Sequence, residues 1–66
     1  MTGEEFKALR KAVGLSQQAL GEALGYEGRT AEMMVQKWEY GQRPINPKHF
    51  RKLSELLHVP LEKFIP

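Results

Sequence analysis

Residues 10–25 read RKAVGLSQQALGEALG, and this stretch ends one helix and begins another within three positions. Gly14 is typical of the residue that stops a helix in the left-handed conformation, and Ser16 is typical of an N-cap. Only Leu15 separates the two, so the sequence predicts two helices joined by a very tight turn. The second helix is expected over about residues 16–24. Its apolar positions are Ala19, Leu20, Ala23 and Leu24.

The segment before this stretch carries its own helix start. Thr2 and Glu5 have the spacing of a capping box, in which the two side chains satisfy free backbone N–H groups at the start of a helix. Apolar residues then recur at helical spacing, at Phe6, Leu9 and Val13. The sequence therefore predicts a first helix that packs one side on the core.

The segment after residue 28 has the signals of a third helix over about residues 30–40. Thr30 is a reasonable N-cap, Glu32 lies in the first turn where the helix dipole favours a carboxylate, and Gly41 is placed to stop the helix. The helical period separates its residues into two sides. The side expected in the core carries Ala31, Met34, Val35 and Trp38. The opposite side carries Glu32, Met33, Gln36, Lys37 and Tyr40.

Asn46 followed by Pro47 predicts the start of a fourth helix, which is expected to end before Pro60. Its apolar positions are Phe50, Leu53, Leu56 and Leu57. A last apolar group is expected to form one short turn on the core, with a dimer seam as the alternative: Leu61, Phe64 and Ile65. No segment alternates with period two for long enough to form a strand. The predicted fold is all-α, with four to five helices in one compact domain over residues 1–66.

The charge of the chain is concentrated in its middle. The net charge is only +2, but residues 29–52 contain six Lys and Arg residues against two Glu residues, a local net charge of +4. A basic centre favours a polyanionic partner. A solvated helix face is an equally good interpretation of the charge alone.

Several classes of function are not expected. The 66 residues contain no Cys, so the chain has neither a disulfide framework nor a thiolate metal site. His49 and His58 have no carboxylate spaced to orient them, and His49, beside Lys48 and Arg51, is interpreted as a solvated helix residue. No apolar run resembles a signal peptide or a membrane span. We therefore expect no enzyme activity, no metal, no cofactor, no small-molecule ligand and no membrane partner.

The outward side of the third helix suits a DNA groove. Glu can accept a hydrogen bond from cytosine N4, Gln can pair with adenine, Lys can donate to guanine, and Met can pack on the methyl group of thymine. The same side chains would also suit an ordinary solvated helix. Periodicity alone leaves these two interpretations open.

Two motifs taken together resemble the lambda-repressor and Cro type (XRE family) of helix-turn-helix. RKAVGLSQQALGEALG (10–25) resembles the first half of that unit, in which an Arg precedes a GLSQ turn and a helix that ends in LG. VQKWEYGQRPI (35–45) is similar to the end of the recognition helix, where an apolar residue, Glu, any residue and Gly follow in that order. The likeness spans nearly the whole chain and implies a lambda-repressor-like fold that binds DNA.

The resemblance implies roles for particular residues. Arg10 and Glu39 match a partly buried ion pair that ties the first helix to the end of the recognition helix, and Gln17 matches a residue that touches phosphate and braces that helix. The implied base-contacting residues are Glu32, Met33, Gln36 and Lys37. The implied phosphate-contacting residues are Gln17, Gln18, Tyr40, Gln42 and Arg43.

Two departures from the family pattern bear on these roles. Gly21 stands where the family commonly has Ala, and a small residue there lets the second and third helices approach closely. The spacing from Gly25 to Glu39 is four residues longer than the family pattern implies, with the extra residues around Tyr26–Arg29. Either the turn is a longer loop, or the recognition helix starts earlier and carries Arg29 and Thr30 towards the bases.

The function predicted from the resemblance and the charge is sequence-specific DNA binding by a transcriptional regulator, a small repressor of a phage or mobile bacterial element that acts by occupying an operator. Because one recognition helix reads few base pairs, a homodimer on an inverted repeat of double-stranded DNA is expected. The alternative is an antitoxin-like or other protein-binding module that uses the same fold. The expected location is the bacterial cytoplasm or nucleoid, or that of a phage-infected host cell.

Overall fold

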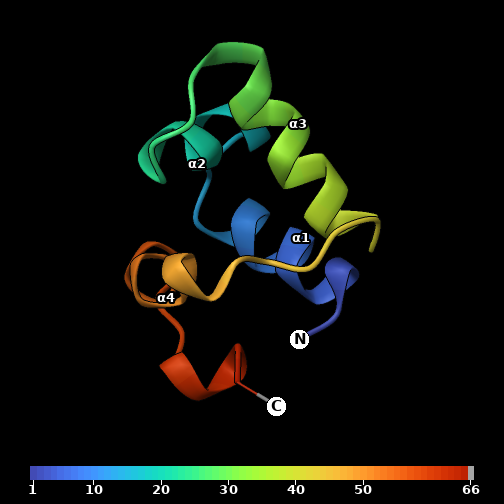
Figure 1. Ribbon diagram of the computed structural model, residues 1–66. Helices are drawn as coiled ribbons and strands as arrows, with labels where there is room; N and C mark the ends of the chain where they lie inside the picture. Colours follow the sequence, from blue (N-terminus) through green and yellow to red (C-terminus); the bar gives the residue numbers. More distant parts are fainter. Residues whose placement is uncertain (66) are drawn as a thin grey trace.

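The computed structural model describes residues 1–65, which form four α-helices and two short 3-10 turns (Figure 1). The helices are α1 (Gly3–Ala12), α2 (Gln17–Ala23), α3 (Gly28–Glu39) and α4 (Phe50–Leu57), and the 3-10 turns are η1 (Pro47–His49) and η2 (Leu61–Lys63). No strand forms within residues 1–65, which confirms the all-α prediction. Within the same residues, no helix has the length and apolar character needed to cross a membrane.

The first two helices begin as the sequence predicts. The Thr2 hydroxyl accepts a hydrogen bond from the Glu5 backbone N–H at 3.0 Å, and the Ser16 hydroxyl accepts one from the Ala19 N–H at 3.0 Å. Each bond satisfies a backbone donor that has no partner inside its own helix. Gly14 follows α1 with a φ of +78°, in the left-handed region. Helices α1 and α2 therefore meet through the expected tight turn.

Helix α3 begins at Gly28, two residues before the predicted start, and the prediction that Thr30 is its N-cap is wrong. The backbone N–H groups of Thr30 and Ala31 both donate to the carbonyl oxygen of Glu27, at 3.1 and 3.3 Å, so Thr30 already lies in the first turn. Glu27 occupies the N-cap position, but its side chain makes no capping hydrogen bond. Of the two explanations for the long spacing after α2, the earlier helix start is the one found.

One apolar core joins all four helices and the last turn. Its buried side chains are Phe6, Leu20, Val35, Trp38, Leu53, Leu57 and Phe64. Phe64 follows η2 and stacks on Phe50 at the start of α4, with ring centroids 5.5 Å apart. The C-terminal segment therefore folds back and helps to close the core, as expected.

Two side chains expected in the core lie outside it. Ile65 is 53% exposed, because Phe64 takes the core position and the next residue points elsewhere. Ala23 is exposed as well. The buried side of α2 is centred on Leu20 and Gly21. The helical period places Ala23 on a different side of the helix, which faces solvent.

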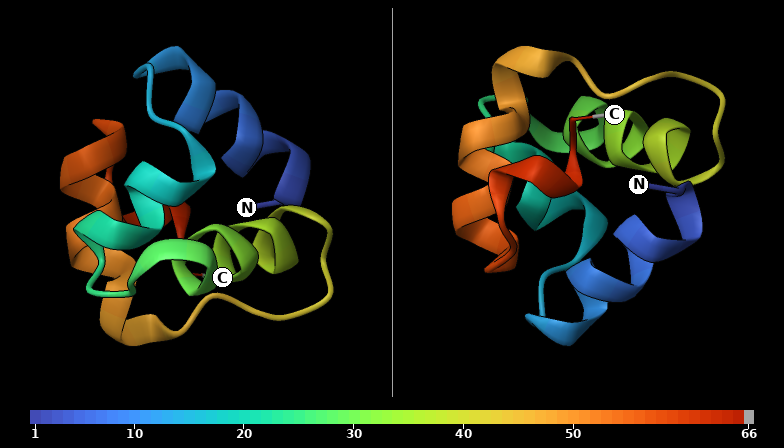
Figure 2. Two further views of the ribbon diagram at one scale, coloured as in Figure 1. Left: turned by 90° about the horizontal axis from the view of Figure 1, so that it is seen from above. Right: turned by 90° about the horizontal axis from the view of Figure 1, so that it is seen from below.

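Helices α2 and α3 lie side by side (Figure 2). Their backbones are in close contact at Gly21. A Cβ built on Gly21 would lie 2.6 Å from the backbone carbonyl carbon of Ala31 and 2.7 Å from its Cα. Close-packed backbone cannot yield that much space without a shift of one helix. The expectation that a small residue brings these helices together is confirmed. An Ala at position 21 would push the two helices apart.

Candidate nucleic-acid interface

Helix α3 presents one side to the core and the other to solvent. Its predicted core residues are buried or half-buried: Ala31, Met34, Val35 and Trp38. On the opposite side the large apolar side chain of Met33 is 43% exposed. All six candidate base-contacting residues lie on α3 and outside the buried core: Arg29, Thr30, Glu32, Met33, Gln36 and Lys37.

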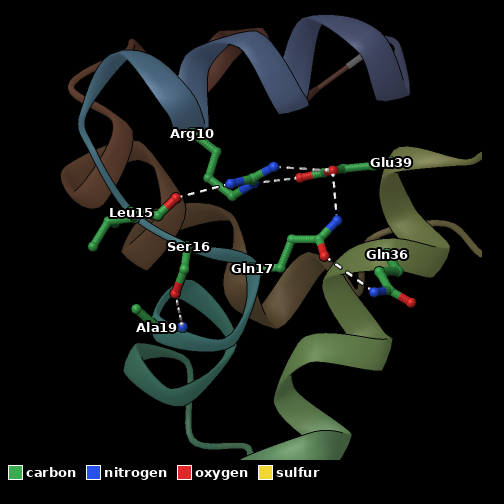
Figure 3. Close-up of polar contacts among 7 residues, drawn as sticks. All are labelled: Arg10, Leu15, Ser16, Gln17, Ala19, Gln36 and Glu39. Carbon is green, nitrogen blue, oxygen red and sulfur yellow. Dashed lines mark hydrogen bonds and ion pairs between the residues drawn. The ribbon is translucent and has the colours of Figure 1, made fainter.

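The expected ion pair between Arg10 and Glu39 is present (Figure 3). The Arg10 Nε donates to Glu39 Oε2 at 2.6 Å, and Nη2 donates to Oε1 at 3.4 Å. The third guanidinium nitrogen, Nη1, donates to the backbone oxygen of Leu15 at 2.8 Å. The two side chains are 8% and 2% exposed, so solvent screens this pair little. Arg10 thus joins α1, the turn before α2 and the end of α3.

Gln17 extends the same contacts to the outward side of α3 (Figure 3). Its Nε2 donates to Glu39 Oε1 at 3.1 Å, and its Oε1 accepts from Gln36 Nε2 at 3.1 Å. The amide oxygen of Gln36 points away from Gln17 in Figure 3 and is free to meet a partner outside the protein. The bracing part of the role expected of Gln17 is therefore visible in its contacts. We name the contacts among Arg10, Gln17, Gln36 and Glu39 the polar network.

The other candidate phosphate-contacting residues lie at the surface. Gln18 is exposed on α2, and its amide donates to Glu22 Oε2 at 3.2 Å. Tyr40 is 68% exposed directly after α3. Gln42 and Arg43 follow in the exposed segment that leads from α3 to η1, and Arg43 lies 3.9 Å from the sulfur of Met34. The side chains of Tyr40, Gln42 and Arg43 are thus open to solvent at the C-terminal end of α3.

The basic centre of the chain is not neutralised by the fold. Within residues 1–65, the ion pairs are Arg10–Glu39 and the exposed pair Lys63–Glu5 at 3.1 Å. None of the six Lys and Arg residues between positions 29 and 52 takes part in either pair. This positive charge remains available to an anionic partner.

His49 is buried, so its interpretation as a solvated helix residue is wrong. It is 6% exposed, and its Nε2 lies 2.9 Å from the hydroxyl oxygen of Tyr26. Burial, and to a smaller extent the positive charge of Lys48, lower the pKa of His49 below its ordinary value. The sequence contained a signal for this position. His49 precedes the buried Leu53 by four residues, a spacing that places both on one side of a helix.

Helices α2 and α3 with the short connection between them form a helix-turn-helix unit, packed on α1 and α4 (Figure 1). The family model described as "Helix-turn-helix" matches residues 6–64 of the chain. The chain therefore belongs to the helix-turn-helix family, and the resemblance to its lambda-repressor and Cro type is confirmed.

Two curated relatives are similar over most of this chain. Each is 31% identical over 62 residues, which cover 94% of this chain and 42% of the relative. One is an uncharacterized HTH-type transcriptional regulator of Sinorhizobium medicae, and the other is an uncharacterized HTH-type transcriptional regulator of Rhizobium meliloti. The chain thus spans less than half the length of these relatives. No solved structure matches the chain significantly.

Proposed function

We propose that this chain binds double-stranded DNA sequence-specifically and represses transcription by occupying an operator. The observation that carries the proposal is the outward side of α3, where hydrogen-bonding side chains stand on a helix that the polar network holds in place. An α-helix fits the major groove of B-DNA, where the base edges can be distinguished. A pre-organised helix loses little conformational freedom on binding.

Each assigned base contact follows from the chemistry of the side chain. Lys37 and Arg29 would donate to guanine O6 and N7, and Gln36 would pair with adenine. Met33 would pack on a thymine methyl group, and Glu32 would accept a hydrogen bond from cytosine N4. The full set of assigned base contacts is Arg29, Thr30, Glu32, Met33, Gln36 and Lys37.

The assigned phosphate contacts lie at the two ends of the helix-turn-helix unit. Gln17 and Gln18 are at the start of α2, and the remaining residues follow α3: Tyr40, Gln42 and Arg43. Phosphate contacts fix the register of a protein on the duplex, while base contacts supply sequence preference. Substitutions in the two sets should therefore have different effects on specificity.

The proposed form on DNA is a homodimer, because one α3 reads too few base pairs for useful selectivity. Its operator would be an inverted repeat with half-sites one helical turn, about 34–36 Å, apart. The proposed setting is a phage or mobile element in the bacterial cytoplasm. No cofactor or small-molecule ligand is assigned.

A protein-binding, antitoxin-like role is the second candidate. The exposed Met33 and Tyr40 favour it, since methionine and tyrosine are enriched at protein–protein interfaces. Both candidates use the same side of α3, so a direct test of DNA selection separates them.

The experiment is a selection from a randomised duplex pool at one near-physiological salt concentration, followed by sequencing of the bound fraction. Enrichment of an inverted repeat is the expected result. Enrichment of a single half-site would retain DNA recognition and contradict the dimer. An unenriched pool from a sample shown to be folded would contradict the repressor role and favour the protein-binding alternative.

A further inference from the structure

Three aromatic side chains from separate segments meet on the inner side of α3. Tyr26 comes from the turn between α2 and α3, Trp38 from α3, and His49 from η1. The ring centroids are 5.4 Å apart for Tyr26–His49, 5.7 Å for Trp38–His49 and 6.2 Å for Tyr26–Trp38, with the rings tilted or edge-on. Such geometry is favourable for aromatic pairs. We name these three residues the aromatic cluster.

The turn that contains Tyr26 has few other restraints. Its Glu27 makes no side-chain cap, and Gly28 has a φ of +52°. Besides the packing of its ring in the aromatic cluster, two polar contacts hold Tyr26. Its backbone N–H donates to the carbonyl oxygen of Gly21 in α2 at 3.1 Å, and its hydroxyl lies 2.9 Å from His49 Nε2. The side-chain contact is thus what links the start of α3 to the segment that leads into α4.

We propose that the Tyr26–His49 hydrogen bond positions the first turn of α3 and so determines which bases Arg29 and Thr30 can reach. This inference rests on the proposed DNA-binding function. Arg29 and Thr30 follow Tyr26 by three and four residues, so a displacement of the tyrosine is carried directly into the first turn. Tyr26 and His49 are positioning residues in this proposal and do not touch DNA themselves.

Two separate sets of contacts then hold the two ends of α3. The polar network fixes the C-terminal half, because Glu39 and Gln36 belong to it. The aromatic cluster reaches the N-terminal half through Tyr26, which precedes the first residue of the helix by two positions. Loss of the Tyr26–His49 hydrogen bond should therefore affect base contacts near Arg29 and leave those near Lys37 largely intact.

The surroundings of His49 favour a neutral imidazole. The rings packed against it are those of Tyr26, from the α2–α3 turn, and Trp38, from α3, and neither brings a carboxylate to pair with an imidazolium. The charged side chains that line the hollow beside it, of about 410 Å³, are Lys48 of η1 and Lys52 of α4. The end of α2 contributes only Ala, Leu and Gly to this hollow.

Acid should therefore weaken the positioning contact. A protonated His49 could still donate to the Tyr26 hydroxyl oxygen, so the hydrogen bond alone does not oppose protonation. Protonation is opposed by burial and, to a smaller extent, by the positive charge of Lys48. Lowering the pH favours conformations in which His49 leaves the aromatic cluster and Tyr26 is released.

The first test needs no DNA and uses amide hydrogen exchange measured by NMR. The reporters are the N–H groups of Thr30 and Ala31, which bond to the Glu27 oxygen in the first turn of α3, with Val35 as the internal reference. Tyr26→Phe keeps the ring and removes the hydroxyl. We expect about three- to tenfold lower protection at the two reporters and little change at Val35. Equal protection in the two proteins would overturn the positioning role.

The pH dependence of hydrogen exchange in the wild-type protein gives a second test at the same two N–H groups. Between pH 7.5 and 5.5 the protection factors of Thr30 and Ala31 should fall. The matched control is His58→Asn, which removes the exposed histidine at a left-handed position that Asn tolerates. The control should retain the fall. Protection that does not change with pH in the wild type would contradict the proposal.

The second test compares the selected operator with a random duplex at one salt concentration. Tyr26→Phe should weaken operator binding about three- to tenfold and random binding less than twofold. In an Arg29→Ala background the same substitution should add little, because the contact that it misplaces is already absent. An equal loss on both duplexes would overturn the inference. If the wild type selects no operator, the proposed function fails, and the exchange at Thr30 and Ala31 still decides the positioning role.

Discussion

Gly3 of α1 packs directly against the last carbonyl group of α3, at Glu39, so the start of one helix meets the end of the other (Figure 2). A Cβ on Gly3 would lie 2.7 Å from the Glu39 carbonyl carbon and 3.0 Å from the Trp38 oxygen. The positive end of one helix dipole then faces the negative end of the other. Helix α1 thus holds the end of α3 twice, by this backbone contact and by the Arg10–Glu39 ion pair.

Gly3→Ala should destabilise the protein by about 1–3 kcal/mol, because the added methyl group has no space beside the Glu39 backbone. At an open helix position the same change would stabilise by about 1 kcal/mol. The sign of the effect is therefore diagnostic. Urea denaturation followed by circular dichroism measures it.

The matched control for this prediction is Ala8→Gly, at an exposed position of the same helix. It should destabilise by about 1 kcal/mol, the ordinary cost of glycine in a helix. Gly3→Ala and Ala8→Gly exchange the same two residue types in opposite directions, and both should lower stability. A stabilised Gly3→Ala variant would show that the two helix ends separate readily and that the close contact has no energetic role.

The contacts that the sequence predicted either join residues close together in the chain or were indicated by the resemblance to a known family. Ser16 and Asn46 are caps whose partners lie two or three residues away, and local signals suffice to find them. The Arg10–Glu39 pair joins residues 29 positions apart, and only the resemblance to a known family indicated it. A search for local helix signals has no access to such a contact.

The features that the sequence did not reveal depend on how distant segments pack. Tyr26 and His49 are 23 positions apart, and neither residue alone indicates the other. Thr30 has the chemistry of a good N-cap, but its N–H is already bonded to Glu27 in a helix that starts earlier. The Gly3–Glu39 contact likewise requires the final helix arrangement. Contacts of this kind depend on the packing of distant segments, and no local signal in the sequence indicates them.

Arg10→Ala should lower stability by about 3–5 kcal/mol, because it leaves the buried carboxylate of Glu39 without its cation. It should also weaken DNA binding, since α3 loses its attachment to α1. Thermal and urea denaturation measure the first effect. Lys63→Ala, which removes one partner of the exposed pair with Glu5, is the control and should change stability very little, because solvent screens that pair. Equal losses in the two variants would contradict a structural role for the Arg10–Glu39 pair.

The free energy of unfolding should fall as the pH is lowered from 7.5 to 5.5. The unfolded chain protonates histidine near its ordinary pKa of about 6.5, whereas burial keeps the pKa of His49 lower in the folded state. The unfolded state therefore binds more protons in this range. The stabilising contribution of neutral His49 is complete above the ordinary pKa and is lost as the pH falls towards the folded pKa.

Urea denaturation at several pH values measures this slope. His49→Phe should reduce the slope of the free energy of unfolding against pH. His58→Asn should leave the contribution of His49 to that slope unchanged. The contact with Lys63 lowers the pKa of Glu5 from its ordinary value of 4.5, so that group contributes only at more acidic pH. A slope that persists in His49→Phe would assign the pH dependence to other groups.

Substitutions on α3 and after it should separate base contacts from phosphate contacts. Lys37→Ala removes a donor that faces outward and is not engaged in an ion pair, so it should weaken operator binding by about 1–3 kcal/mol and random-DNA binding much less. Gln36→Ala should act in the same direction, although it also removes one hydrogen bond to Gln17. Fluorescence anisotropy with the selected operator and a random duplex measures both.

Arg43→Ala provides the contrast, because Arg43 lies in the exposed segment after α3 and is assigned to phosphate. Its loss should weaken binding to both duplexes by a similar factor and reduce the slope of log K against log salt by about one unit. The titrations are repeated at several salt concentrations so that the slope is measured for each variant. If Lys37→Ala, Gln36→Ala and Arg43→Ala all gave the same sequence-independent loss, α3 would touch DNA without reading its bases, and the groove assignment would be wrong.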